Sequence, residues 1–218
     1  MEILSNINVI LYIVAYLVGS IPVGAILVKL FSGQNILEIG SKSTGATNVY
    51  RAFSDNPRRA KMFSIATLLL DAFKGLSVVL IGKLCGASFE TQYMIAILAI
   101  LGHCYSPFLG FSGGKGVATS IGSLILLIPV EGFLGLIVWA LVGKVFKISS
   151  LSSLLGVLSG VIFSFIIPNL FTLPPSIDIN AQISTHVPVV LIAIIILNTH
   201  IDNIKRLLRK EEKQIISG

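Results

Sequence analysis

The sequence has 218 residues, of which 54% are hydrophobic and only 12% charged, and its mean hydropathy is +0.92. Soluble domains carry about 25% charged residues, so this composition excludes a soluble protein and indicates one membrane-embedded domain over residues 1–218. The formal net charge of +6 lies in short segments between apolar runs, which favours membrane orientation over nucleic-acid binding.

Apolar runs of a length suited to membrane crossing follow one another along the chain. They lie at about 7–30, 63–84, 93–111, 117–145, 151–167 and 184–198. The first run has neither a basic start nor a cleavage site, so we expect it to be retained as a span, with a break at GSIPVG, residues 19–24.

The run at 117–145 is long for one span and short for two, and Pro129 and Glu131 near its middle favour a tight turn. If the chain crosses the membrane twice within this run, the outer side holds Glu2, Lys83, Glu90, Glu131 and Asp178. The inner side then holds Lys42, Arg51, Arg58, Arg59, Lys61, Lys115, Lys144, Lys147, Lys205, Arg206, Arg209, Lys210 and Lys213. The positive-inside rule therefore predicts an all-α polytopic membrane protein with seven transmembrane helices, its N-terminus outside and its C-terminus cytoplasmic. We expect an external loop at 168–182 and a short surface helix at 205–213.

Glycines surround one lysine in the segment that reads GHCYSP at 102–107 and SGGKGVAT at 112–119. Glycines allow successive backbone N–H groups to face one anion, and Lys115 adds a point charge. A helix that begins near Gly116 would direct its positive end to the same place. The pattern is typical of phosphate binding, but it lacks the GxxxxGK[ST] order of an ATP site. A flexible turn with Lys115 reaching lipid headgroups is an equal alternative.

A second polar segment, at 40–51, contains Ser43, Thr47, Asn48 and Arg51. All four can donate hydrogen bonds to phosphate or hydroxyl oxygens, and Arg51 can donate two in parallel. The residues alone slightly favour a simpler interpretation, in which Thr47 or Asn48 caps a helix and Arg51 meets lipid phosphates.

Three histidines differ in context. His200 stands three residues before Asn203, so the two share a face if this segment is helical. A lone histidine at a membrane end is more often interfacial than catalytic, which applies to His103 as well. His186, on the outer side, is interpreted as structural.

Other polar residues interrupt the apolar runs. Asp71 and Lys74 are three residues apart and can neutralise each other, which favours a structural pair. The sixth expected helix opens with Ser149, Ser150, Ser152 and Ser153, which could cap it or face a ligand. Cys85 and Cys104 show no metal-ligand spacing, so we expect packing roles, no metal and no cofactor.

Together these motifs resemble the bacterial acyl-phosphate:glycerol-3-phosphate acyltransferase family (PlsY) nearly from end to end. They are GSIPxG at 19–24, GATNxxR at 45–51, DxxKG at 71–75, GHxxxxF at 102–108, GGKGVAT at 113–119, Ser150 and Ser153, and HxxNIxRL at 200–207. The resemblance implies seven helices in the bacterial cytoplasmic (inner) membrane and an active site facing the cytoplasm. It implies transfer of an acyl group from acyl phosphate to glycerol 3-phosphate, forming lysophosphatidic acid and inorganic phosphate in phospholipid biosynthesis. The expected partners are these substrates, membrane lipids and an enzyme that produces acyl phosphate, without nucleic acid.

The resemblance also implies site residues. Glycerol 3-phosphate would be held by Arg51, Lys115, His200, Asn203, Ser43 and Asn48. The acyl-phosphate head would be held by Ser153, Thr47 and the backbone N–H groups of Gly113, Gly114 and Gly116. The base would be His103, His200 or, as we favour, a substrate phosphate oxygen. Where the family reads GSGNxGATN, this chain has Lys42 and Ser43 in place of a glycine and an amide.

A different class of protein competes with the enzyme: a transporter or flippase for a phosphorylated small molecule or lipid. Its phosphate-binding segments would serve recognition, but here they all lie on one side, and no pair of broken segments corresponds between two halves. A third interpretation is a structural membrane subunit. Against it, the inner segments carry more polar residues than anchoring in the membrane requires.

Overall fold

The computed structural model describes residues 6–212 and 214, and these residues are helical without β-strands. The helices are α2 (Ile7–Ser20), α3 (Val23–Ser32), η1 (Ile36–Glu38), α4 (Ala46–Ala52), α5 (Pro57–Leu84), α6 (Phe89–Cys104), η2 (Pro107–Leu109), α7 (Val117–Leu124), α8 (Pro129–Phe146), α9 (Ser149–Leu170), α10 (Ile179–Ile183), α11 (Val187–Thr199) and α12 (Ile201–Leu208). Glu2 and Lys213 of the charge argument lie outside the described residues.

The first apolar run is broken where expected. Helix α2 ends at Ser20 and α3 begins at Val23, because Pro22 has no N–H with which to continue the hydrogen-bond ladder. At this break the carbonyl oxygen of Ile21 accepts a hydrogen bond of 3.0 Å from Nζ of Lys74 on α5. The interruption therefore provides a partner for a lysine buried in the bundle.

Two glycines allow helices to pack at close range. A Cβ atom on Gly19 of α2 would overlap the backbone of Ala99 on α6, and one on Gly122 of α7 would overlap the carbonyl of Ala72 on α5. The second contact holds α7 against α5 near Asp71. The start of α7, which follows Lys115, is thereby fixed close to the buried charges of α5.

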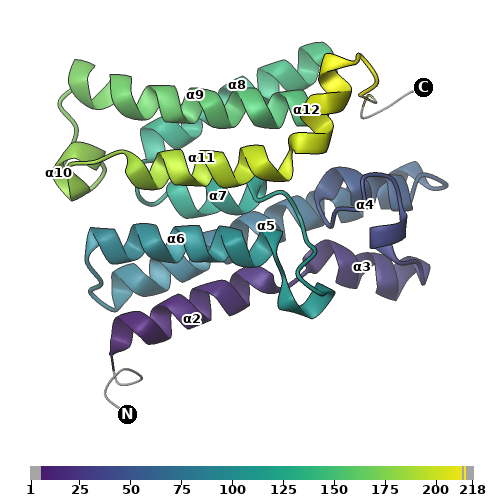
Figure 1. Cartoon of the computed structure of the whole chain (residues 1–218), viewed down its shortest axis with the longest axis horizontal. Helices are drawn as coiled ribbons and strands as arrows, with labels where there is room; N and C mark the ends of the chain where they lie inside the picture. Colours follow the sequence, from purple (N-terminus) through teal and green to yellow (C-terminus); the bar gives the residue numbers. More distant parts are fainter. Residues whose placement is uncertain (1–5, 213, 215–218) are drawn as a thin grey trace.

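Four helical stretches are long and apolar enough to cross a membrane, and a fifth results if the bent pair α11 and α12 is counted as one span. The four are Ile7–Ser32, Pro57–Leu84, Pro129–Phe146 and Ser149–Leu170. Helix α6 is a shorter apolar helix, and α7 has only 8 residues. The run at 117–145 divides at 125–128 into α7 and α8, and successive helices from α5 to α9 alternate in direction along the bundle (Figure 1). The number of crossings and their orientation stay predictions.

Three expected boundaries were wrong. The run at 93–111 does not continue as helix beyond Cys104, because the segment with Pro107 turns back and the Ser106 N–H donates to the Ser112 carbonyl at 3.2 Å. The loop expected at 168–182 contains the end of α9 and the short helix α10, which Asp178 caps. The tail helix begins earlier than expected, at Ile201, and ends at Leu208.

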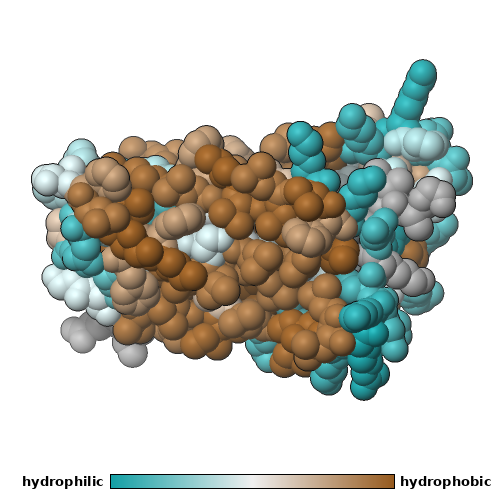
Figure 2. All heavy atoms as spheres, turned by 90° about the horizontal axis from the view of Figure 1, so that it is seen from above, coloured by the Kyte–Doolittle hydropathy of each residue, from teal (hydrophilic) through white to brown (hydrophobic). Residues whose placement is uncertain are grey.

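Polar side chains gather at one end of the molecule. Figure 2 shows a broad apolar surface on the face that it draws and hydrophilic residues at the end that carries α3, α4 and α12. The bundle bears many exposed large hydrophobic side chains, among them Leu69, Phe73, Leu141 and Leu158. A surface of this kind is suited to lipid and not to water.

Candidate active site

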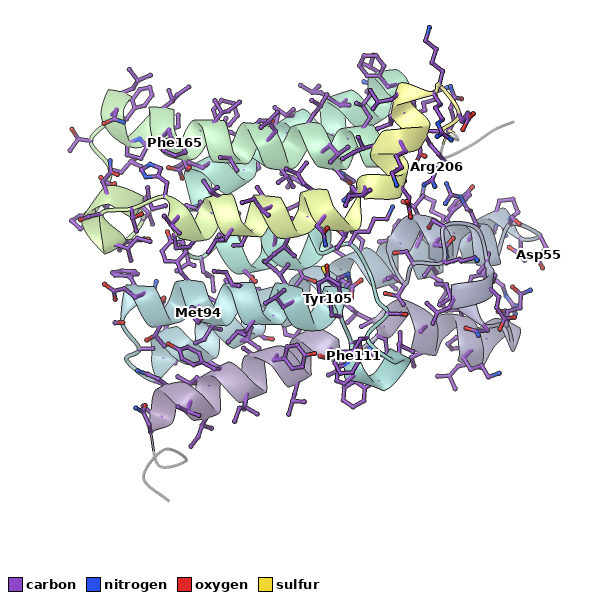
Figure 3. All side chains as sticks on the ribbon, viewed as in Figure 1. Asp55, Met94, Tyr105, Phe111, Phe165 and Arg206 are labelled. Carbon is purple, nitrogen blue, oxygen red and sulfur yellow. The ribbon has the colours of Figure 1, made fainter. Side chains whose placement is uncertain are left out.

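A cleft of about 640 Å³ lies at the polar end of the bundle. It brings together residues from the segments 40–51 and 102–119, from the start of α9 and from the bend between α11 and α12: Ser43, Thr47, Asn48, Arg51, His103, Lys115, Gly116, Ser153, His200 and Asn203. Of the predicted site residues, Gly113 and Gly114 are not among those that line it. Arg206, which also lines it, lies on α12 toward the same end as Asp55 (Figure 3).

Asn48 organises the loop before α4 through its side chain. Its Nδ2 donates to the carbonyls of Ile36, Ile39 and Ser43 at 3.2, 3.0 and 2.8 Å, and its Oδ1 accepts from the Ser41 N–H at 3.1 Å. No amide hydrogen of Asn48 is left for a ligand. In this structure Asn48 shapes the loop that carries Ser43 and leads to Arg51, and its role in binding substrate stays a prediction.

The glycine-rich loop is tied to its surroundings through its backbone. The Gly114 N–H donates to the His103 carbonyl at 2.9 Å, and the Thr44 N–H donates to the Gly113 carbonyl at 3.3 Å. The Gly114 N–H is thus used within the protein in this structure, and its contact with a substrate phosphate stays a prediction. Gly116 differs: it adopts a left-handed φ of 83° as the N-cap of α7 and lines the cleft.

A buried charged cluster lies at the inner end of the cleft. Nζ of Lys74 lies 2.9 Å from Oδ1 of Asp71, and Nδ1 of His103 lies 3.5 Å from the same oxygen. The other side of the His103 ring packs against Gly114, where a Cβ atom would overlap the imidazole. His103 thus lies within ion-pair distance of Asp71, and the pairing of Asp71 with Lys74 that their spacing predicted is observed.

Lys115, Asn203 and His200 form one group at the bend between α11 and α12. Nζ of Lys115 donates to Oδ1 of Asn203, and the backbone carbonyl of Lys115 accepts from the Thr199 hydroxyl at 3.1 Å. Nδ1 of His200 lies 2.8 Å from the Ile196 carbonyl, which can only accept, so Nδ1 carries a proton. The expected proximity of His200, Asn203 and Lys115 is thus observed.

Glu212, which the sequence did not single out, lies within this group of cations. Its Oε1 accepts from Ser150 at 2.8 Å and from Nδ2 of Asn203 at 2.6 Å, and its Oε2 accepts from Nε of Arg206 at 2.6 Å. The motif HxxNIxRL includes Arg206 but stops five residues short of Glu212. In sequence, Glu212 is one of several alternating charges in the tail, and no spacing distinguishes it.

Burial shapes the electrostatics of the cleft. It lowers the pKa of Arg51, and it lowers the pKa of Lys115 to about 8, while the nearby Glu212 opposes both shifts. Burial would raise the pKa of Glu212, but hydrogen bonds from Arg206, Asn203 and Ser150 hold it below its ordinary value. The cations are thus poorly solvated, which favours binding of an anion.

Hydroxyl groups line the wall of the cleft between α4 and α9. The Thr47 and Ser149 hydroxyls lie 2.8 Å apart, which joins the start of α4 to the start of α9. Ser43 and Ser153 are buried and line the cleft. These side chains can donate hydrogen bonds to oxygens of a bound anion.

A helical bundle with an apolar surface and a cation-lined cleft at its polar end defines an integral membrane protein that handles an anionic ligand. The family model described as glycerol-3-phosphate acyltransferase matches residues 9–210, and the chain belongs to this family of enzymes. The resemblance inferred from the motifs is thereby confirmed.

The relatives match over nearly their whole lengths. The chain is 60% identical to a glycerol-3-phosphate acyltransferase of Helicobacter hepaticus, over 98% of this chain and 96% of the relative. It is 49% identical to one of Helicobacter pylori, over 98% and 97%. Its fold matches the crystal structure of PlsY, an integral membrane glycerol 3-phosphate acyltransferase, in the glycerol 3-phosphate form, with a TM-score of 0.81 and 30% identity over 95% of this chain and 94% of that chain. The lysophosphatidic acid form of PlsY matches with a TM-score of 0.77.

Proposed function

We propose that the protein transfers an acyl group from acyl phosphate to glycerol 3-phosphate and releases 1-acyl-glycerol 3-phosphate and inorganic phosphate. The observation that carries the donor assignment is the construction of the cleft from two sets of anion-binding groups. One set is the cation group of Arg51, Lys115 and Arg206, and the other is the hydroxyl-lined wall with Thr47 and Ser153. Two phosphate-bearing substrates would require two such sets.

The position of Glu212 supports the cation group as the binding site for glycerol 3-phosphate. This carboxylate takes up hydrogen bonds from Arg206, Asn203 and Ser150 that a phosphate could accept in its place. We assign the phosphate of glycerol 3-phosphate to Arg51, Lys115, Arg206 and Asn203, with His200 beside them. PlsY, the structural relative, was crystallised in a glycerol 3-phosphate form.

We assign the phosphate of the donor to the wall formed by Ser43, Thr47 and Ser153 and to the first turn of α7 after Gly116. The N-terminal end of a helix attracts anions through its free N–H groups. Gly113 and Gly114 contribute indirectly, since their backbone contacts with Thr44 and His103 fix the loop that leads to α7. The acyl chain would leave the cleft between helices toward the lipid.

The reaction needs positioning and charge stabilisation more than a strong catalyst, because acyl phosphate is already activated. The acceptor hydroxyl oxygen bonds to the acyl carbonyl carbon, the bond from that carbon to the phosphate oxygen breaks, and phosphate departs with the electron pair. We propose that the hydroxyl proton passes to a phosphate oxygen of the donor. His103→Gln should then keep most of kcat, whereas a loss of about a hundredfold would identify His103 as the base.

We further propose seven crossings of the bacterial inner membrane, with the cleft and the C-terminus on the cytoplasmic side. Basic residues at the end that carries the cleft, including Arg58, Arg59, Lys61 and Lys205, support this orientation. The donor would be supplied on that side by an enzyme that produces acyl phosphate.

The proposal is tested with purified protein in liposomes, palmitoyl phosphate and glycerol 3-phosphate. Phosphate and lysophosphatidic acid should form in equal amounts, and palmitoyl-CoA should not replace the donor. Accumulation of labelled glycerol 3-phosphate inside sealed liposomes, without product, would instead support the transporter.

A further inference from the structure

A narrow apolar cavity extends the cleft into the bundle between α7, α8, α9 and α11. The two spaces share five lining residues, which are Val117, Ile121, Leu136, Trp139 and Ser153. From this shared region the cavity continues past Gly135, Gly156, Val157, Gly160 and Ile192. Apart from serines at the shared end, its walls offer hydrophobic side chains and glycines until its far end is reached.

The far end of the cavity contains a carboxyl group. Glu131 lies in the first turn of α8, is 0% exposed, and lines the cavity together with Ile128 and Val161. Neither of its carboxylate oxygens has a hydrogen-bond partner among the described residues. Burying an unpaired polar group costs free energy, so its position at the end of an apolar channel calls for an explanation.

Glu131 could stabilise the N-terminus of α8 without being buried. Glu90 occupies the first turn of α6 at the same end of the bundle and is exposed there, where it faces the helix N-terminus from solvent. Glu131 has the same helical position but lies inside the bundle, in contact with the cavity. The difference in burial between Glu90 and Glu131 is therefore explained by the contact of Glu131 with the cavity and not by its position in the helix.

The distance from the shared region to Glu131 follows from helix geometry. Trp139 and Glu131 are eight residues apart on α8, which corresponds to about 12 Å along the helix axis. Ser153 and Val161 on α9 have the same separation. The cavity thus offers an acyl chain that starts at the cleft a path of limited length.

We propose that Glu131 ends the path of the donor's acyl chain and sets the upper limit of chain length that the enzyme accepts. This inference rests on the proposed function. A chain that stops short of Glu131 contacts only apolar walls, whereas a longer chain must bring methylene groups against an unpaired carboxyl or bend out of the cavity. Glu131 is therefore a specificity-determining residue remote from the reacting atoms.

The test offers the enzyme an equimolar mixture of octanoyl, lauroyl, palmitoyl and stearoyl phosphate with glycerol 3-phosphate, and measures the ratio of the lysophosphatidic acids by mass spectrometry. A ratio does not depend on how much of a variant is folded. Glu131→Ala should shift the ratio toward the longer chains by about tenfold, because one poorly fitting methylene group changes selectivity by at least this factor. Glu131→Gln keeps size and polarity and should leave the ratio unchanged, as should Glu90→Ala, which removes an exposed carboxylate at the same end.

A second variant tests the path from the opposite direction. Val161→Phe narrows the far end and should shift the ratio toward the shorter chains by a similar factor. An unchanged ratio in both Glu131→Ala and Val161→Phe would overturn the inference, even though acyl transfer continues. If the unmodified protein forms no product from any acyl phosphate, the proposed function itself fails.

Discussion

Two charged clusters share the polar half of the molecule, and they differ in how their charges are balanced. On α5 and α6, Asp71 lies between Lys74 and His103, and the three side chains are almost completely buried. At the mouth of the cleft, Arg51, Lys115 and Arg206 surround Glu212, whose chain segment follows α12. The first cluster is closed on itself, whereas the second has more cations than its buried carboxylate can neutralise.

The difference indicates what each cluster does. A buried pair with one charge of each sign, such as Asp71 and Lys74, leaves no net charge to attract an anionic ligand. A group with surplus positive charge, whose carboxylate comes from a segment near the end of the chain, can exchange that carboxylate for a phosphate. Four predictions would break or sharpen this contrast.

The largest effect on stability is expected from Asp71→Leu, because it leaves the Lys74 ammonium buried without its carboxylate. Removing one partner of a buried pair costs about 3–5 kcal/mol. Thermal and denaturant unfolding in detergent should show this loss, and Asp71→Leu combined with Lys74→Met should recover most of it. The exposed pair of Asp202 and Lys205, at 3.9 Å, is the matched control, and Asp202→Leu should change stability by less than about 1 kcal/mol. Equal losses at both pairs would contradict the structural role of the buried cluster.

The largest effect on substrate affinity is expected from Lys115→Ala and Arg51→Ala. Each removes a charge-assisted contact worth about 1.5–3 kcal/mol, so KM for glycerol 3-phosphate should rise roughly tenfold to a hundredfold. Lys205→Ala, which removes an exposed lysine of α12, should leave KM unchanged and serves as control. An unchanged KM in both cleft variants would remove the glycerol 3-phosphate site from this cluster.

A smaller effect is expected from pH. The pKa of Lys115 is lowered to about 8 by burial, and only the protonated amine attracts phosphate. The kcat/KM for glycerol 3-phosphate should therefore be maintained below this pH and fall by up to about tenfold per pH unit above it. Lys115→Arg should move the decline to higher pH, since a guanidinium stays charged. A decline at the same pH in this variant would assign the titration to another group.

Much of this architecture could be predicted from the sequence, because it depends on local signals. Pro22 predicted the broken first span, Pro129 predicted the division of the run at 117–145, and the spacing of Asp71 and Lys74 predicted their pairing. The motif resemblance predicted the family and most of the residues that meet in the cleft, Gly113 and Gly114 excepted.

The remaining features depend on contacts between distant parts of the chain. An asparagine such as Asn48 cannot be distinguished from a substrate-binding residue until its three backbone acceptors are seen. The Gly114 N–H is similar, since its acceptor is a carbonyl at the end of another helix. In sequence, Glu131 indicates only a turn and Glu212 has no distinguishing pattern, and only the packing places one beside an apolar cavity and the other among cations.

The smallest effect is expected from a substitution of Glu212, and it distinguishes two roles of this carboxylate. In our proposal the carboxylate competes with the substrate phosphate. The alternative is that it holds Arg206 and Asn203 in position. Glu212→Gln keeps the side chain's size and an acceptor for Ser150 while removing the negative charge. If the carboxylate competes with phosphate, KM for glycerol 3-phosphate should fall by about two- to fivefold with kcat unchanged, equivalent to roughly 0.5–1 kcal/mol. If it only positions Arg206 and Asn203, KM should rise instead. Glu211→Gln is the matched control, because the neighbouring glutamate is exposed and its removal changes the net charge equally. A fall in KM confined to Glu212→Gln would show that the second cluster exchanges its anion, which is the property that distinguishes it from the closed cluster around Asp71.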